Sequence, residues 1–382
     1  MNILVVFFHF PPISGGGVVV AVDIVNSFAK MGHNVTVLTP NLVWNGPEYK
    51  PEMDSKIKIV RVDVPSSSNL KIAARRCKNP LINKGKELAS KNKFDFVFSI
   101  FHPFHFAPNA AVSISEILKI PVIIKIDDAV YEKSTGLKSI QRKIERIISS
   151  RMLTKAAKIL VVNDETKKIV KDFYNIPIEK ISIIPNGIDV DLFHVRSIKN
   201  SKIVFFSGVM YYHRGVDILL KSVSDVVKKI PEVKFLLIGG GPELDNLQKI
   251  VKDYNIDKNV EFRNWVERKK IINFLSEASI GIGPLRSTTV TKDALPIKVL
   301  EYMAASLPII AQKNTLPHSV LIDGENGFFV SNEEELVTKI VYLLENEQKS
   351  KEMGLKSREI VSNFDWKLIA SKIIDEYKNL KI

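Results

Sequence analysis

Two loops in the second half of the sequence combine glycines with a candidate cation. Gly208 begins a loop that also holds Arg214, and Gly240 lies inside the turn Gly239–Glu243. Glycines let a backbone approach a ligand at a helix N-terminus, where an arginine can pair with a pyrophosphate. The loops are therefore candidates for binding a nucleotide. Tight strand-to-helix turns are the alternative interpretation.

Residues 293–311 hold the most specific arrangement of charged groups. Lys298 and Glu301 lie one turn apart on a predicted helix, a few residues after Asp293. A carboxylate in this position can accept hydrogen bonds from vicinal hydroxyls, such as those of a ribose. The alternative is that Glu301 is solvated or caps the helix.

In the first half, a glycine loop with Gly16 and Gly17 joins the first predicted strand to a helix, which suits a phosphate or a sugar. Its spacing differs from G-x-G-x-x-G, and the second strand closes Val37-Leu38-Thr39-Pro40, without an acidic residue. A nicotinamide dinucleotide site is therefore disfavoured. A tight turn remains the alternative.

Apolar runs typical of buried parallel strands alternate with amphipathic helical stretches along the chain. In the first half we predict strands at Asn2–Phe8, Asn34–Leu38, Lys58–Val62, Phe94–Ile100, Pro121–Ile126, Lys158–Val162 and Ile181–Ile184. The pattern then begins again, with strands at Ile203–Ser207, Lys234–Ile238, Val260–Phe262, Ile280–Ile282, Pro308–Ala311 and Gly327–Val330. Two Rossmann-like, doubly wound α/β domains over 1–190 and 200–365 are the simplest account.

The composition is that of a globular protein. The 382 residues are 45% apolar and 25% charged, which argues against disordered and fibrous classes. Cys77 is the only cysteine, so an intrachain disulfide or a cysteine zinc site cannot form, and a cytoplasmic location fits best. The apolar start Ile3–Phe10 is too short for a signal peptide or a membrane span.

The order of these motifs resembles the retaining glycosyltransferases of the GT-B fold, specifically family 4, also called glycosyl transferases group 1. The resemblance covers nearly the whole chain, and its matching segments are Phe10–Gly17, Ile184–Asp189, Gly208–Gly215, Gly239–Glu243 and Glu301–Ile310. It implies two domains that face each other across a cleft. It also implies transfer of a sugar from a nucleoside-diphosphate sugar with retention of anomeric configuration, without a metal or other cofactor.

The resemblance places the donor mainly on the second half of the chain. Glu301 matches the second acid of the family's Glu-x7-Glu motif and would hold the ribose, while Asp293 replaces the first acid. Arg214 takes the place of the family's pyrophosphate-binding lysine. Val209 stands where the family often has an arginine, which leaves Lys298 as the second cation. The donor-binding glycines would be Gly16, Gly17, Gly208 and Gly240.

In many members a histidine ends the strand that corresponds to Pro121–Ile126, whereas this chain has Asp127 and Asp128. Either carboxylate could orient the acceptor hydroxyl or stabilise positive charge at the anomeric carbon, and His102 or His105 could supply the imidazole. The alternatives are aspartates that cap a helix and histidines with a structural role.

In the implied mechanism, Arg214, Lys298 and helix N-termini stabilise the departing pyrophosphate. Asp189 and Asp191 are not expected to bind a metal, because they lie in the motif at the domain junction. Two other functions remain open for this architecture. One is a sugar-nucleotide 2-epimerase, and the other is a catalytically silent subunit that binds sugar nucleotides.

The segment Asn363–Trp366 resembles the family's lead-in to a final helix. We therefore expect residues 366–382 to pack back on the first domain, through an apolar face made of Leu368, Ile369, Ile373, Ile374 and Tyr377.

The net charge of +13 is concentrated in residues 1–190, where 27 Lys and Arg face 17 Asp and Glu. The stretch 71–93 is especially basic, and Phe101, Phe104 and Phe106 could meet an apolar chain. We expect a glycan or lipid-linked acceptor, as in cell-envelope polysaccharide biosynthesis, and peripheral contact with an anionic inner membrane face. The alternative is a solvated basic helix. No nucleic-acid partner is expected.

Overall fold

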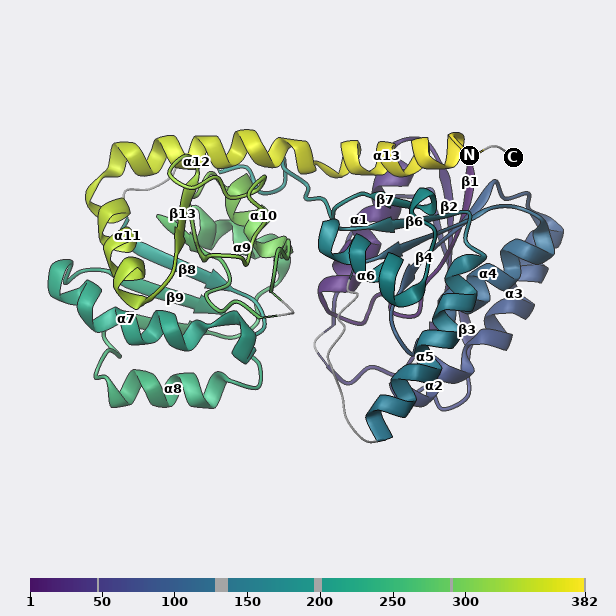
Figure 1. Cartoon of the computed structure of the whole chain (residues 1–382), viewed down its shortest axis with the longest axis horizontal. Helices are drawn as coiled ribbons and strands as arrows, with labels where there is room; N and C mark the ends of the chain where they lie inside the picture. Colours follow the sequence, from purple (N-terminus) through teal and green to yellow (C-terminus); the bar gives the residue numbers. More distant parts are fainter. Residues whose placement is uncertain (47, 128–136, 196–200, 289–290, 381–382) are drawn as a thin grey trace. The chain divides into compact units, whose positions relative to one another are not determined.

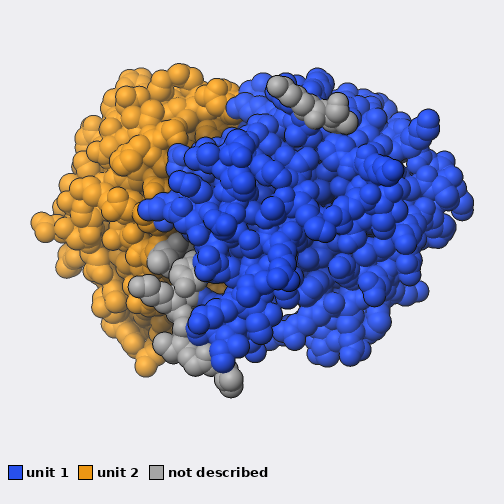
Figure 2. Space-filling model, turned by 45° about the vertical axis from the view of Figure 1, so that its right-hand side comes forward, with its two compact units in different colours: residues 1–187, 366–382 blue, residues 188–365 orange. Residues whose placement is uncertain are grey.

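The computed structural model describes residues 1–46, 48–127, 137–195, 201–288 and 291–380, so Asp128 lies outside the described residues. The chain forms two compact units, one of residues 1–187 with 366–382 and one of residues 188–365 (Figure 2). Each unit holds one parallel sheet with helices against it (Figure 1). The prediction of two doubly wound α/β sheets is confirmed.

The first unit is built on seven parallel strands in the order β3-β2-β1-β4-β5-β6-β7. Their bounds are β1 Asn2–Val6, β2 Asn34–Asn41, β3 Ile57–Asp63, β4 Phe96–Phe101, β5 Val122–Ile126, β6 Lys158–Val161 and β7 Ile181–Ile183. Strand β1 lies between β2 and β4, with Val6 opposite both Leu38 and Ser99. The strand order reverses here, and ligands of such sheets bind at the carboxyl ends of the strands at this point.

The helices of this sheet are distributed unevenly. Their bounds are α1 Gly16–Lys30, α2 Leu70–Arg76, α3 Lys78–Lys91, α4 Ala107–Leu118, α5 Leu137–Thr154 and α6 Asp164–Tyr174, and a 3-10 turn spans Ile178–Lys180. All helical crossovers except the one through α1 move in the same direction along the sheet. Right-handed connections therefore place α2 to α6 on one face, where they share a core with Leu4, Val97 and Ile124.

The final helix α13, Trp366–Lys378, completes the opposite face beside α1. The Trp366 indole donates to Asp23 Oδ2 at 3.0 Å, and the Tyr377 ring stacks on Phe96 at 4.7 Å between centroids. Ile369 is buried, but Leu368 is 49% exposed. The expectation that Leu368 docks is wrong, because it lies off the helical stripe formed by residues 366, 369, 370, 373 and 374.

The second unit has six parallel strands in the order β10-β9-β8-β11-β12-β13. The strands are β8 Ile203–Ser207, β9 Lys234–Ile238, β10 Val260–Arg263, β11 Ile280–Ile282, β12 Ile309–Gln312 and β13 Gly327–Val330. The helices are α7 Val216–Lys229, α8 Leu244–Asp253, α9 Arg268–Leu275, α10 Ile297–Ala304, α11 Glu333–Glu345 and α12 Glu347–Val361, with 3-10 turns at Tyr212–Arg214 and Ser362–Phe364.

Helix α7 packs on α8 and α11, whereas α10 packs on α12, so helices cover both faces of this sheet. Its strand order reverses between β8 and β11. The segments that follow these two strands, with helix α10, carry Arg214, Asp293, Lys298 and Glu301. None of the described helices is long and apolar enough to cross a bilayer.

Candidate functional site

The loops after β8 and β9 are packed tightly against each other. The Met210 N–H donates to the carbonyl of Gly240 at 2.8 Å, and the Glu243 N–H donates to that of Met210 at 3.1 Å. A Cβ on Gly239 would collide with the Gly208 carbonyl oxygen, and one on Gly241 would lie 2.8 Å from Met210 N. This close approach accounts for Gly239 and Gly241 without a ligand.

Lys298, on α10, points its ammonium group into the protein beneath the β8 loop. Its Nζ is buried, lies 3.6 Å from the centre of the Phe206 ring, and has no hydrogen-bond partner among the described residues. Its Cδ would be 3.7 Å from a Cβ on Gly208. Burial, with the nearby charge of Arg214, lowers the pKa of Lys298 well below its usual range, against the opposing charge of Glu301. A buried ammonium without an acceptor is costly, so the site favours an anion.

Two further basic side chains adjoin Lys298. Arg214 and His213 belong to the turn after β8, and burial, followed by the charges of Arg214 and Lys298, lowers the pKa of His213. The Arg214 carbonyl accepts a hydrogen bond from Leu285 N at 3.0 Å. Gly215 has φ of 70°, and a Cβ there would be 2.8 Å from the Leu285 carbonyl carbon. The turn that carries Arg214 is therefore fixed against the loop after β11.

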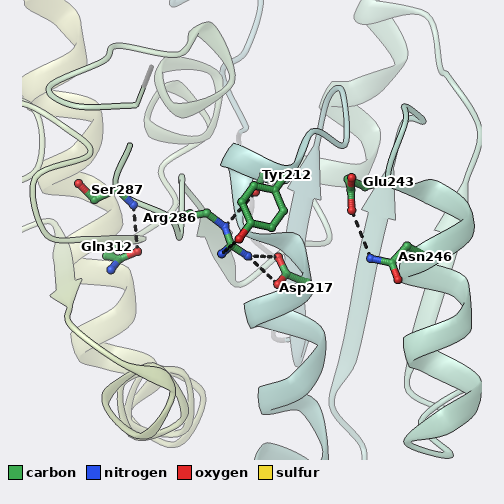
Figure 3. A network of polar contacts seen from close by, with 7 residues as sticks. All are labelled: Tyr212, Asp217, Glu243, Asn246, Arg286, Ser287 and Gln312. Carbon is green, nitrogen blue, oxygen red and sulfur yellow. Dashed lines mark hydrogen bonds and ion pairs between the residues drawn. The ribbon is translucent and has the colours of Figure 1, made fainter. Parts of the chain in front are cut away.

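Arg286 contacts both the turn after β8, at Tyr212, and the start of α7, at Asp217 (Figure 3). Its guanidinium binds both carboxylate oxygens of Asp217, at 2.7 and 2.6 Å, and donates to the Tyr212 hydroxyl at 2.9 Å. The guanidinium carbon lies 3.8 Å from the centre of the Tyr212 ring. Both contacts to Asp217 come from Nη2, while Nη1 donates to the Tyr212 hydroxyl and Nε donates to the Tyr212 carbonyl at 3.0 Å. The separate donors of a planar guanidinium make these contacts at once, and lysine lacks this arrangement.

Glu301 is buried on α10 and is therefore neither a solvated residue nor a helix cap. Arg268 of α9 donates from Nε to Glu301 Oε1 at 3.0 Å, with both side chains at least 85% buried. The next residue, Tyr302, accepts from Ser207 N at 2.7 Å, which joins α10 to the end of β8. Asp293 lies in the loop before α10, with φ of 48°, and its N–H donates to the Asn314 carbonyl at 3.3 Å.

The glycine loop of the first unit leaves open space above α1. Gly16 and Gly17 are exposed, and a Cβ on either would meet nothing within 4 Å. Packing within the described residues therefore does not require glycine at these two positions. Since α1 has no acidic residue in its first turn, its N-terminus can accept an anionic or polar group.

Three histidines gather at the carboxyl ends of β1 and β4, where the strand order reverses. The rings of His102 and His105 stack at 4.2 Å, and His9 lies 5.0 Å from His105. Burial, followed by the charge of His102, lowers the pKa of His9 to about 4 and that of His105 to about 3. Both rings are therefore neutral near pH 7, whereas His102 is exposed.

Asp127 follows β5 and is paired with a lysine inside the sheet. Lys125 is fully buried, and its Nζ donates to Asp127 Oδ1 at 2.5 Å and to the Ile184 carbonyl at 3.5 Å. The other oxygen of Asp127, Oδ2, is buried and accepts no hydrogen bond from the described residues. One carboxylate oxygen is thus fixed while the other retains its capacity to accept.

Sequence reasoning missed several members of these clusters. His9 lies inside the apolar start of the sequence, in the loop that follows β1. Lys125 is the one charged residue in an aliphatic run, which is a usable signal for a buried functional or structural charge. Arg268 and Arg286 carry no comparable signal. No group of three or more His, Cys, Asp or Glu side chains suited to a metal ion occurs in the described part of the chain.

Two family models match the chain in succession. The model of Glycosyltransferase Family 4 matches residues 14–192, and that of Glycosyl transferases group 1 matches residues 189–360. The first covers most of the unit with the histidines and Asp127, and the second covers the unit with Lys298 and Glu301.

Individual relatives are distant. An uncharacterised glycosyltransferase of Haemophilus influenzae is 24% identical over 96% of each chain. The GDP-mannose-dependent alpha-(1-6)-phosphatidylinositol monomannoside mannosyltransferase of Mycolicibacterium smegmatis is 22% identical, over 42% of this chain and 44% of its own. The alpha-monoglucosyldiacylglycerol synthase of Acholeplasma laidlawii is 26% identical, over 47% and 48%.

Among solved structures, sucrose-phosphate synthase from Thermosynechococcus elongatus matches with a TM-score of 0.76 at 16% identity, over 99% of this chain and 98% of its own. HepE of Anabaena, in complex with UDP and glucose, matches with a TM-score of 0.75 at 16% identity, over the whole of both chains. At such identities the likeness shows a shared fold.

Proposed function

Because the chain belongs to the GT-B glycosyltransferases of family 4, or group 1, we propose that it transfers a sugar from a nucleoside-diphosphate sugar to a glycan or lipid-linked acceptor, with retention of anomeric configuration. One observation carries the proposal. The buried Nζ of Lys298 lacks a hydrogen-bond partner among the described residues and lies beside Gly208 and the basic turn with Arg214. The diphosphate of a donor would supply the missing acceptors.

In this proposal the second unit binds the donor. Lys298 and Arg214 hold the diphosphate, and Glu301 accepts hydrogen bonds from the ribose hydroxyls while Arg268 fixes its other side. Asp293 approaches the sugar, and Gly16, Gly17, Gly208 and Gly240 give backbone access. HepE was solved with UDP and with UDP-glucose, which supports a uridine nucleotide as the first donor to test.

Cationic side chains would stabilise the leaving group without a metal. As the glycosidic bond to the donor breaks, negative charge develops on the diphosphate, and preorganised cations in a dry site stabilise such charge strongly. Activity is therefore expected to survive an excess of EDTA. Strict dependence on a divalent cation would contradict this part of the proposal.

The first unit would bind the acceptor. Asp127 Oδ2 can accept a hydrogen bond from the attacking hydroxyl, because Lys125 occupies only Oδ1. His102 is the exposed imidazole of the histidine cluster and is the second candidate for this contact. The names of two relatives contain the glycolipids phosphatidylinositol monomannoside and monoglucosyldiacylglycerol, which supports lipid-linked acceptors and contact with an anionic membrane.

The test measures donor binding and chemistry separately. Calorimetric titration with UDP and GDP should show binding that K298M or E301Q weakens by about 10 to 150-fold, as expected for charge-assisted hydrogen bonds. The matched control is K313M, at an exposed lysine of the same unit. Equal affinity in all variants would remove the donor-site assignment.

Incubation with the sugar nucleotide alone, followed by NMR, distinguishes the competing functions. A transferase leaves the sugar unchanged or hydrolyses it slowly, an epimerase inverts one of its carbons, and a silent subunit only binds. With an acceptor, the anomeric coupling constant of the product reports retention or inversion directly.

A further inference from the structure

Helix α5 presents a stripe of isoleucines to solvent. The exposed fractions are 56, 53, 51 and 38% for Ile140, Ile144, Ile147 and Ile148. These positions follow the i, i+4, i+7, i+8 spacing of a single helical face, on a helix of 18 residues. The opposite face is buried in the unit through Glu145, Ser149, Met152 and Leu153. The isoleucines therefore leave a large part of their apolar surface in solvent, whereas the opposite face packs α5 on the unit.

Positive charge accompanies this stripe. Lys143, Arg146 and Arg151 are exposed on the same helix. Its one acidic residue, Glu145, is buried and accepts a hydrogen bond from Ser149 Oγ at 2.6 Å. The solvent side of α5 thus combines an apolar stripe with cations and carries no carboxylate.

The basic stretch 71–93 has a different character. All its lysines and arginines except Lys93 lie on α2 and α3, where Ile72 is the one large apolar side chain described as exposed. Isolated exposed apolar residues are ordinary, whereas four in one stripe mark an interaction surface. Helices α2 and α3 therefore fit a solvated basic face, and α5 fits an interface.

We propose that α5 docks on an anionic lipid surface, with the isoleucine stripe at the boundary between headgroups and acyl chains. A helix with an apolar face, a basic polar face and low mean hydropathy binds membranes in this way. A second copy of the chain is disfavoured as the occupant of this surface. Two α5 helices paired around a two-fold axis would bring together the lysines and arginines that flank their isoleucine stripes. The proposal extends the proposed function, because a lipid-linked acceptor would then be presented to the unit that holds Asp127.

Vesicle cosedimentation of the full chain tests the proposal. Wild type should bind phosphatidylcholine vesicles that contain about 30 mol% phosphatidylglycerol, bind pure phosphatidylcholine weakly, and be released by added NaCl. I144S/I147S should weaken binding about tenfold or more, through loss of the inserted apolar area. The matched control is I117S/I178S, at isoleucines of the same unit that are 46 and 51% exposed outside α5.

Charge variants provide a second, independent arm. K143Q/R151Q should weaken binding to the anionic vesicles, and R75Q/R76Q, on the basic stretch, should change it little. The proposal is overturned if wild type binds neither vesicle, if I144S/I147S binds like its control, or if only R75Q/R76Q abolishes binding. It is also overturned if I144S/I147S converts a dimer to a monomer and leaves vesicle binding intact.

Titration with UDP in every variant separates this proposal from the proposed function. Vesicle binding by a protein that binds no nucleotide would support the α5 surface and contradict the donor site. Nucleotide binding by a protein that does not bind vesicles would support the donor site and contradict the α5 surface.

Discussion

The Nζ atom of Lys125 lies 2.5 Å from Oδ1 of Asp127, in a lysine side chain that is fully buried within the sheet. The contact joins the one charged residue of β5 to the carboxylate that follows the strand. Asp127 is therefore held in one orientation by a charge that cannot reach water.

Replacing Lys125 alone should leave the Asp127 carboxylate without its buried ion-pair partner. We expect K125M to lower the free energy of unfolding by about 3–5 kcal/mol, and K125M/D127N to recover part of that loss, because both buried charges are then gone. K158M, which removes a more exposed partner of Glu376 in the same unit, should cost less. Urea unfolding measures all three. If the double variant is no more stable than K125M, the pair is not coupled.

Donor binding should be accompanied by proton uptake at Lys298. Burial lowers its pKa in the free protein, and a bound diphosphate would raise it again. Binding therefore strengthens as pH falls through the interval between the two pKa values and weakens as pH rises. Calorimetry of UDP binding in Tris and in HEPES reports the protons taken up. An equal uptake in K298M would assign the proton to another group.

Arg286 should act on the donor through the turn that it clamps. R286A releases Tyr212 and Asp217, so we expect UDP affinity to fall about tenfold. R286K should lie between, because its single ammonium can still pair with Asp217 but cannot also make both donations to Tyr212. R263A provides the control, because Arg263 forms a half-exposed pair with Glu261. Loss of affinity in R263A to the same extent would point to general destabilisation.

The histidine cluster should make the protein sensitive to acid. His9 and His105 have folded pKa values of about 4 and 3, below the ordinary value of 6.5, so the unfolded chain binds more protons between these limits. Stability should therefore fall as pH drops below about 6.5, by about 1 kcal/mol per pH unit for each histidine. Unfolding of H105N between pH 7 and pH 4.5 should show a smaller slope. H194N, at an exposed histidine, should retain the wild-type slope.

Neighbouring residues of α13 should differ sharply in their contribution to stability. Ile369 is fully buried, so I369A should cost about 2–4 kcal/mol, whereas L368A should stay within about 0.5 kcal/mol. Truncation before Trp366 should destabilise the first unit, as its amide hydrogen exchange would report, and leave the second protected. Equal costs for I369A and L368A would contradict the observed docking face.

Strands were predictable because buried parallel strands are continuous apolar runs. Ile203–Ser207, Lys234–Ile238 and Ile280–Ile282 match β8, β9 and β11 residue for residue. The run at Asn2–Phe8 was too long, since β1 ends at Val6 and Phe8 belongs to the loop, where its ring packs against His9 and His105. Apolar loop residues at a sheet edge extend the pattern beyond the strand itself.

The candidate site was predictable where chemistry follows strand ends. Lys298 and Arg214 could be anticipated together, since they follow β11 and β8, which are neighbours where the strand order reverses. Their supporting partners could not. The contacts of Arg268 with Glu301 and of Arg286 with Asp217 join residues 33 and 69 positions apart, and no local spacing encodes such a meeting.

Because the first unit is discontinuous in sequence, it cannot finish folding until the end of the chain has been synthesised. Its last helix begins at Trp366, after all of residues 188–365 have been made. At about 5–20 residues per second, the ribosome needs roughly ten to forty seconds to cover that interval. Throughout it, the apolar surface of the nascent sheet that awaits Ile369 and Ile373 stays uncovered. We therefore expect this face of the nascent chain to attract chaperones, and we expect the second unit, which is continuous in sequence, to fold first.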